Sequence, residues 1–309
     1  LGCLRESAMS RPLRYQPEEW SIFFVTGRCI QSRFLLRPSP RVNALIVGVL
    51  ARALERFDIR LFGMCFLSNH YHLLLSSKNA ASLASFMQYV GSNIAREVGR
   101  QHRWKEKFWS RRYTASMVLD EAAQIDRMKY ILSNSVKEGL VKHPRYWPGV
   151  HCYRNLAEGT PLHGIWIDRT SQHVHSAVTE KQATTKLTLN LAQLPFYETL
   201  SSYEYQATMR ALAKEAVEDS QDESQSQYLG QKRILNVDPH SKPKSVDKSP
   251  APLCHSGCPR KYRAFVESFR EFVSDYKHAY GRIVEGILSV GLPHGSLPPT
   301  GWSVSFSSG

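Results

Sequence analysis

The sequence lacks an apolar run long enough to cross a bilayer, and its first residues contain no apolar stretch typical of a secretory signal. Its six cysteines are scattered, without the regular spacing of a disulfide framework. One local cluster, Cys254-His255-Ser256-Gly257-Cys258, has no second ligand pair at the spacing of a structural zinc site. These absences argue against a membrane protein, a secreted disulfide-rich protein and a zinc finger, and they favour a cytoplasmic location.

Acidic residues are also in short supply, because 27 Asp and Glu stand against 40 Lys and Arg, for a formal net charge of +13. A surplus of this size favours a polyanionic partner, most simply nucleic acid, over a merely basic soluble protein. No nucleotide-binding loop and no internal repeat is visible. With 309 residues, the chain is long enough for a substantial core and an appendage or second domain.

Two histidines separated by one residue stand at the head of an apolar run, Asn69-His70-Tyr71-His72-Leu73-Leu74-Leu75. Side chains alternate between the two faces of a strand, so His70 and His72 should point one way and Tyr71 the other. Two imidazoles on one side of a sheet could bind one divalent metal. Taken alone, such a pair is more often a structural, hydrogen-bonded pair at a strand end.

A second informative stretch lies about 60 residues further on, at residues 128–141. Its pattern predicts the end of an amphipathic helix closed by Gly139. Tyr130 and Asn134 are four residues apart and share one face of that helix. On its own, Tyr130 would be interpreted as a helical tyrosine half-buried in the core.

Apolar periodicity outlines the order of elements around these two stretches. The pattern predicts strand, helix, strand, strand, helix, strand, helix, which indicates an α+β fold with helices packed on an antiparallel sheet. The predicted strands are 21–26, 57–67, 70–77 and 113–118, and the helices begin near Pro40, near Ala81 and after Asp120.

A segment rich in cations and aromatic rings connects the second helix to the fourth strand. Cations hold phosphates and rings stack on bases, so this composition favours single-stranded DNA binding. The alternative is a solvated charged loop whose aromatic rings pin it to the core. The DNA-binding candidates are Arg100, Arg103, Trp104, Lys105, Lys107, Trp109, Arg111, Arg112 and Tyr113 in this segment, together with Arg28 and Lys137.

The two stretches together resemble the HUH endonuclease superfamily, and most closely the single-tyrosine transposases that include the REP-associated tyrosine transposases. In that family a strand ending in Asn-His-(bulky)-His precedes a helix carrying Tyr-Ile-x-x-Asn-Pro-Val-x-x-Gly-Leu-Val. Here Asn69-His70-Tyr71-His72 matches the first motif, and residues 130–141 match the second except that Ser135 replaces the proline. Trp109-Ser110-Arg111-Arg112-Tyr113 is similar to a further family signature. The resemblance covers about residues 20–155.

The resemblance implies a ferredoxin-like sheet and a particular division of roles. His70 and His72 are expected to bind a divalent metal, Mg²⁺ or Mn²⁺, with Asn134 as third ligand where relatives commonly have Gln. Tyr130 is expected to attack DNA as the nucleophile and to form a 5′-phosphotyrosine. A phenol has a pKa of about 10, so it needs a nearby cation or base at neutral pH.

The sequence therefore predicts a transposase that cuts and rejoins single-stranded or hairpin DNA, as a monomer or homodimer without membrane contact. One alternative is a host-retained protein that binds DNA hairpins without cutting them. The other is a replication-initiation or mobilisation nuclease of the same superfamily, although the longer histidine cluster or helicase domain usual there is not visible.

The chain is expected to divide into an irregular N-terminal segment and a catalytic domain, followed by an extension of helices and disordered linker. We expect residues 220–309 to be dispensable for cleavage, because they contain no residue that matches a family site. The boundaries are 1–20 for the N-terminal segment, 21–155 for the catalytic domain, 156–219 for an accessory extension, 220–258 for a flexible linker, 259–285 for a C-terminal helix and 286–309 for a disordered tail.

Overall fold

The computed structural model describes residues 13–174, 177–220, 227–244, 251–287 and 289–297. Its central sheet has the strand order β2-β3-β1-β4-β7, and the first four strands pair antiparallel. The strands are β1 (Ser21–Arg28), β2 (Ile59–Phe66), β3 (His70–Ser77), β4 (Thr114–Val118) and β7 (Cys254–His255). Because α1 (Pro40–Leu54) joins β1 to β2 and α2 (Ala80–Gln101) joins β3 to β4, β1 to β4 have ferredoxin-like topology. The predicted fold class is confirmed.

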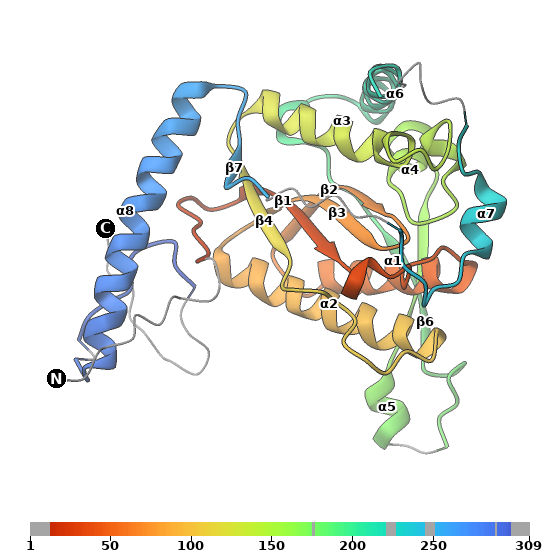
Figure 1. The fold of residues 1–309 in the computed structure, drawn as a ribbon, viewed down its shortest axis with the longest axis horizontal. Helices are drawn as coiled ribbons and strands as arrows, with labels where there is room; N and C mark the ends of the chain where they lie inside the picture. The colour runs from red at the N-terminus through yellow and green to blue at the C-terminus, as the bar shows by residue number, and fades with distance from the viewer. Residues whose placement is uncertain (1–12, 175–176, 221–226, 245–250, 288, 298–309) are drawn as a thin grey trace.

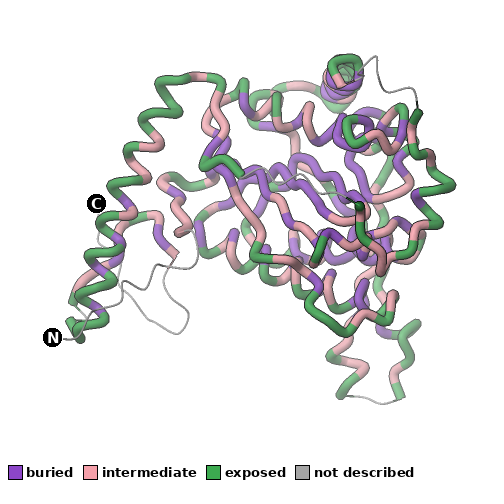
Figure 2. Tube along the Cα trace, in the orientation of Figure 1, coloured by how far each residue is buried: buried purple, intermediate pink, exposed green. Residues whose placement is uncertain are grey.

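Helices cover both faces of this sheet (Figure 1). Helices α1 and α2 pack side by side beneath it, and α3 (Glu121–Lys137) crosses the opposite face. Each of these helices begins at a capping side chain that accepts a backbone N–H: Ser39 from Val42 at 3.2 Å, Asn79 from Ser82 at 2.8 Å, and Asp120 from Ala123 at 2.9 Å. The buried residues gather in the sheet and on the inner sides of these helices (Figure 2).

The register of β3 against β1 fixes where the two histidines point. His72 pairs with Thr26 and His70 pairs with Arg28, whereas Tyr71 pairs with Gly27. A Cβ atom on Gly27 would overlap the Tyr71 ring, so only glycine leaves room for this aromatic side chain. Tyr71 is buried in the core against Phe66 and Trp109, on the face away from α3. The alternation predicted from the sequence is confirmed.

Residues 156–219 pack closely on the sheet and helices of residues 21–155. A hairpin of β5 (Leu162–Ile167) and β6 (Thr184–Leu189) lies on α1, where Gly48 and Gly164 bring two backbones into contact. On the other side, α4 (Tyr153–Glu158) and α6 (Ser202–Glu218) pack against each other, and α6 contacts α3. Residues 156–219 also contain α5 (Arg169–Val174) and the short 3-10 helix Pro195–Tyr197, and two further 3-10 helices, Ile30–Ser32 and Pro144–Tyr146, lie earlier in the chain.

The described residues between 220 and 258 differ from the flexible linker that the polar composition of this stretch predicts. These residues contain α7 (Gln231–Asn236) and β7, which pairs parallel with β4 through Cys254 and His255. Hydrogen bonds to Asp120 fix the position of the residues that follow β7. The Asp120 carboxylate accepts from the backbone N–H of Gly257 at 3.1 Å and from the Ser256 hydroxyl, in addition to capping α3.

Helix α8 (Pro259–Val284) follows β7 and agrees with the predicted C-terminal helix. Its aromatic stripe packs on Tyr15, and the ring centroids of Tyr15 and Phe272 lie 4.5 Å apart. Leu292, within the segment 286–309 that composition predicts as disordered, is fully buried in the same cluster. The rest of the predicted tail, 298–309, and most of the N-terminal segment, 1–12, lie outside the described residues. Within the described ranges, no helix is long and apolar enough to cross a membrane.

Candidate active site

His70 and His72 lie on the face of the sheet that α3 crosses, with their ring centroids 5.0 Å apart. Both side chains are almost fully buried. The Asn69 amide nitrogen donates to the Ser32 carbonyl at 3.3 Å, so its oxygen accepts the Nδ1–H of His70 at 2.7 Å. Nδ1 of His72 is hydrogen-bonded to the Thr26 hydroxyl at 3.0 Å. Nε2 of His70 therefore carries a lone pair, and an outer partner orients each ring, as is typical of metal-binding histidines.

The electrostatics keep both imidazoles neutral. Burial, and secondarily the Arg28 charge, lowers the pKa of His70 to about 3. Burial, followed by the charges of His70, Arg28 and Arg127, holds the pKa of His72 well below its ordinary value. Nε2 of His72 is buried and has no hydrogen-bond partner among the described residues. A neutral imidazole with an unused nitrogen is the form that binds a divalent metal.

Tyr130 projects from α3 onto the same face. Its ring centroid lies 5.1 Å from that of His72 and 5.7 Å from that of Phe24, both in perpendicular arrangement. Burial is the main reason that the pKa of Tyr130 is raised, and the Glu138 charge adds to the effect, while the Arg127 and Arg28 charges oppose it. The phenol is therefore protonated at neutral pH and needs an activating charge before it can attack a phosphodiester.

Asn134 lies one helical turn after Tyr130 and is fully buried. Its amide neighbours the Cys65 thiol, and Cys65 pairs directly with His72 across β2 and β3. Among the described residues, neither its oxygen nor its nitrogen has a nitrogen or oxygen partner. A buried amide without such partners is costly, which fits an oxygen ligand for a cation. In the described ranges, no cluster of three or more His, Cys, Asp or Glu is suited to a metal.

Two residues near Tyr130 were not among the sequence candidates. Arg127 places its guanidinium carbon 5.3 Å from the Tyr130 ring centroid, and its Nε is buried without a described partner. It lies three residues before Tyr130, so helical spacing alone could have identified it. His255, on β7, packs edge-on against Phe24, with the two ring centroids 5.6 Å apart. Burial and the Arg127 charge lower the pKa of His255 to about 4. No local pattern places His255 here, because a two-residue strand has no periodicity.

The predicted DNA-binding residues divide into two groups. Trp109 donates to the Gly91 carbonyl at 2.8 Å and packs on Tyr71, away from the histidines. Trp104 donates to the Lys107 carbonyl at 3.3 Å and lies beside His240. These two rings attach the segment to the rest of the chain. This agrees with the alternative interpretation of a charged loop held to the core by its aromatic rings. The exposed cations of the segment are Arg100, Arg103, Lys105, Lys107, Arg111 and Arg112.

Arg28, Lys137 and Tyr113 complete the predicted set. Arg28 ends β1 opposite His70, and Lys137 lies on α3 with its Nζ 5.3 Å from the Tyr130 ring centroid. The structure thus brings these two cations to the histidine and tyrosine side chains. Tyr113 is half-buried and donates its hydroxyl hydrogen to the Leu83 carbonyl at 3.4 Å. It faces a separate cavity on the other side of the sheet.

The ferredoxin-like sheet, with two histidines beneath a helical tyrosine, has the architecture of a single-tyrosine HUH protein. Residues 36–134 match the family described as "Transposase IS200 like". The family resemblance drawn from the two motifs is confirmed.

Two relatives illustrate the similarity. A protein of Haemophilus influenzae (strain ATCC 51907 / DSM 11121 / KW20 / Rd), named "Putative REP-associated tyrosine transposase", is 24% identical over 112 residues, which span 33% of this chain and 64% of the relative. A solved structure of a REP-associated tyrosine transposase bound to a REP hairpin is 18% identical. It covers 49% of this chain and 87% of its own chain, with a TM-score of 0.41.

Proposed function

We propose that this protein is a metal-dependent transposase that binds single-stranded or hairpin DNA and cuts it with Tyr130. One observation carries the proposal: the ring centroids of Tyr130 and His72 lie 5.1 Å apart, and the buried Nε2 of His72 has no partner among the described residues. A tyrosine beside a neutral imidazole with an unused nitrogen suits a nucleophile beside a metal ligand.

The residues of the site have distinct roles in this proposal. His70, His72 and Asn134 would hold Mg²⁺ or Mn²⁺, which supplies polarisation of a non-bridging phosphodiester oxygen. Arg127 and Lys137 flank Tyr130 on α3 and hold the scissile phosphate by charge. Burial raises the pKa of Tyr130, and the positive charges of Arg127 and Arg28 oppose this rise.

The cleavage step is a displacement at phosphorus. The Tyr130 phenol gives its proton to solvent water, and its oxygen forms a bond to phosphorus. The bond from phosphorus to the 3′ oxygen breaks, and that oxygen takes a proton from water to become a free 3′-hydroxyl. The resulting 5′-phosphotyrosine retains the energy of the cleaved bond, so a later attack by a 3′-hydroxyl rejoins strands without a nucleotide cofactor.

A non-cutting protein that binds DNA hairpins is the second candidate. The raised pKa of Tyr130 favours it, because a phenol that stays protonated is a poor nucleophile. The exposed cations of residues 100–112 would serve either protein, since they hold phosphates whether or not a strand is cut.

The decisive experiment is a cleavage assay on labelled single-stranded hairpins with Mg²⁺, with Mn²⁺ and with chelator. A cutting transposase gives a covalent protein–DNA adduct only when metal is present. Binding without any adduct under all three conditions would instead establish the second candidate.

The same assay also tests the role of Arg127 in adduct formation. Arg127→Gln removes the charge beside Tyr130, and we expect adduct formation to slow by about a hundredfold, the usual cost of losing one charge-stabilising donor. The matched change on an exposed arginine outside the site, Arg60→Gln, should leave the rate unchanged. Equal rates for the two variants would remove Arg127 from the mechanism.

A further inference from the structure

A cavity of about 510 Å³ lies on the face of the sheet opposite Tyr130, between β4, the start of α2 and α8. Phe23 lines it, whereas the next residue, Phe24, packs on His72 and Tyr130 on the other face. The cavity is therefore separate from the candidate active site. Its volume lies within the usual range for sites that bind small ligands, about 300–1,000 Å³.

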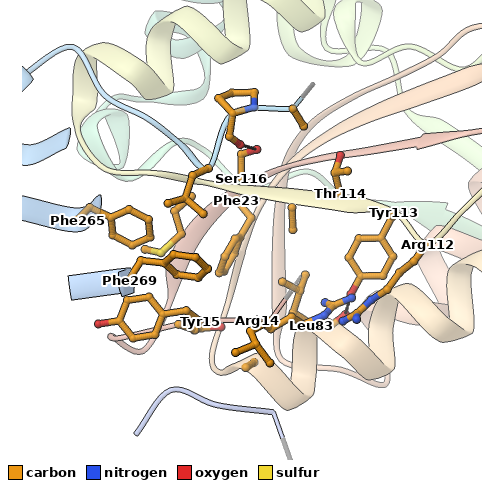
Figure 3. Close-up of a pocket in the computed structure, with 18 of the residues that line it drawn as sticks. Arg14, Tyr15, Phe23, Leu83, Arg112, Tyr113, Thr114, Ser116, Phe265 and Phe269 are labelled. Carbon is orange, nitrogen blue, oxygen red and sulfur yellow. Dashed lines mark hydrogen bonds between the residues drawn. The ribbon is translucent and has the colours of Figure 1, made fainter. Parts of the chain in front are cut away.

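Aromatic rings form the walls of this cavity. Figure 3 shows Tyr15, Phe265 and Phe269 on one side, Phe23 between, and Tyr113 across from them. Ring faces on opposite sides of a gap suit a flat aromatic ligand, because stacking on such surfaces stabilises every base regardless of its identity.

Positive charge accompanies the rings. Arg14 stacks its guanidinium on Tyr113, with its central carbon 4.1 Å from the ring centroid. Nε and Nη1 of Arg14 are buried and have no partner among the described residues, and burial lowers the pKa of Arg14 to about 10. Arg111 and Arg112 line the same cavity, and none of its described lining residues is acidic. A buried guanidinium without an anion is costly, so the site fits a ligand that brings negative charge.

We propose that this cavity binds one unpaired nucleotide of the DNA, with its base between the aromatic walls and its phosphate on Arg14. The inference rests on the proposed function, since the DNA is the source of the nucleotide. Arg111 is exposed and belongs to the basic segment of residues 100–113, so the cavity continues the surface expected to hold the DNA backbone. An uncharged apolar ligand would leave Arg14 unpaired.

Binding measurements on two hairpins test the proposal, one with an unpaired single-stranded flank and one without. Arg14→Gln should weaken binding of the flanked hairpin about tenfold or more and leave the blunt hairpin unchanged. Phe269→Leu keeps an apolar side chain but removes a ring, and should have the same selective effect. Arg270→Gln, an exposed neighbour on α8 outside the cavity, is the matched control. Equal weakening for both hairpins, or none, would overturn the proposal.

Photocrosslinking locates the base directly. A flank carrying 5-iodouracil should crosslink to Tyr15, Tyr113, Phe265 or Phe269, as mass spectrometry of the peptides would show. Crosslinks confined to the face of Phe24 and Tyr130, in protein that still forms the covalent adduct, would overturn the cavity assignment alone. If the wild-type protein neither binds nor cuts either hairpin, the proposed function fails and the cavity assignment fails with it.

Discussion

Several tyrosines compete for the role of nucleophile, and their surroundings separate them. Tyr71 is buried on the face away from the histidines, and Tyr113 faces the separate cavity. Tyr89 stacks on Trp166, on the side of the sheet that holds α2. Only Tyr130, among these four, contacts a histidine of the candidate site.

Replacing Tyr130 by Phe removes one oxygen and little volume. The fold, the metal site and DNA affinity should survive, because the ring still packs on Phe24 and His72. The covalent protein–DNA adduct should disappear from denaturing gels. Tyr113→Phe should still form it. A phosphotyrosyl peptide located by mass spectrometry on any residue other than Tyr130 would contradict the assignment.

Replacing both His70 and His72 by Ala should abolish cleavage but change DNA affinity little, because exposed cations provide the phosphate contacts. Titration calorimetry with Mn²⁺ should show metal binding to the wild type and none to the double variant. Cleavage by the double variant that continues undiminished in the presence of chelator would exclude a metal role for this pair.

At the scale of elements, the sequence predicts best what depends on short-range periodicity. A period of two in β3 is sufficient to place His70 and His72 together and Tyr71 opposite. Helical spacing is sufficient to place Asn134 on the face of Tyr130. The four principal strands and three helices of residues 21–137 follow from the same patterns.

The contacts that the sequence did not predict depend on distant segments. The register of β7 on β4 brings His255 to Phe24, and a polar, proline-containing segment gives no sign of that pairing. The orientation of Trp109 depends on its hydrogen bond to Gly91, so composition alone could not separate a base-stacking ring from a packing one. An effect of Trp109→Ala on DNA affinity would therefore also include lost packing.

Helix α3 and the turn at residues 256–258 share one carboxylate, that of Asp120. Asp120→Ala should lower the free energy of unfolding by about 2 kcal/mol in total. This exceeds the loss of about 1 kcal/mol that is usual for an ordinary helix cap. Ser39→Ala, which uncaps α1 alone, is the matched control. Urea unfolding measures both, and equal losses would mean that the contact with residues 256–258 contributes nothing.

At the scale of the whole molecule, buried neutral histidines make stability depend on pH. Burial lowers the pKa of His151 from 6.5 to about 4. The unfolded chain takes up this proton below pH 6.5 and the folded chain does not, so stability present above pH 6.5 is lost as pH falls towards 4.

The pH dependence can be assigned to a residue by substitution. His151→Gln should flatten the fall in unfolding free energy between pH 6.5 and 4 by up to about 3 kcal/mol, at about 1.4 kcal/mol per pKa unit. Urea denaturation at several pH values, in the absence of divalent metal, gives the slope. His163→Gln, at an exposed position on β5, is the control and should keep the wild-type slope. If the unfolding free energy of all three proteins had the same dependence on pH, His151 would not be its source.

The contact between Gly48 and Gly164 has a consequence for the comparison of related sequences. A Cβ on either glycine would overlap backbone atoms of the other segment, so the β5–β6 hairpin can rest on α1 only when both positions are glycine. We expect the two glycines to be kept or lost together across relatives. Their joint presence would mark which relatives carry the β5–β6 hairpin, and an alignment of many relatives could identify those sequences without further structures.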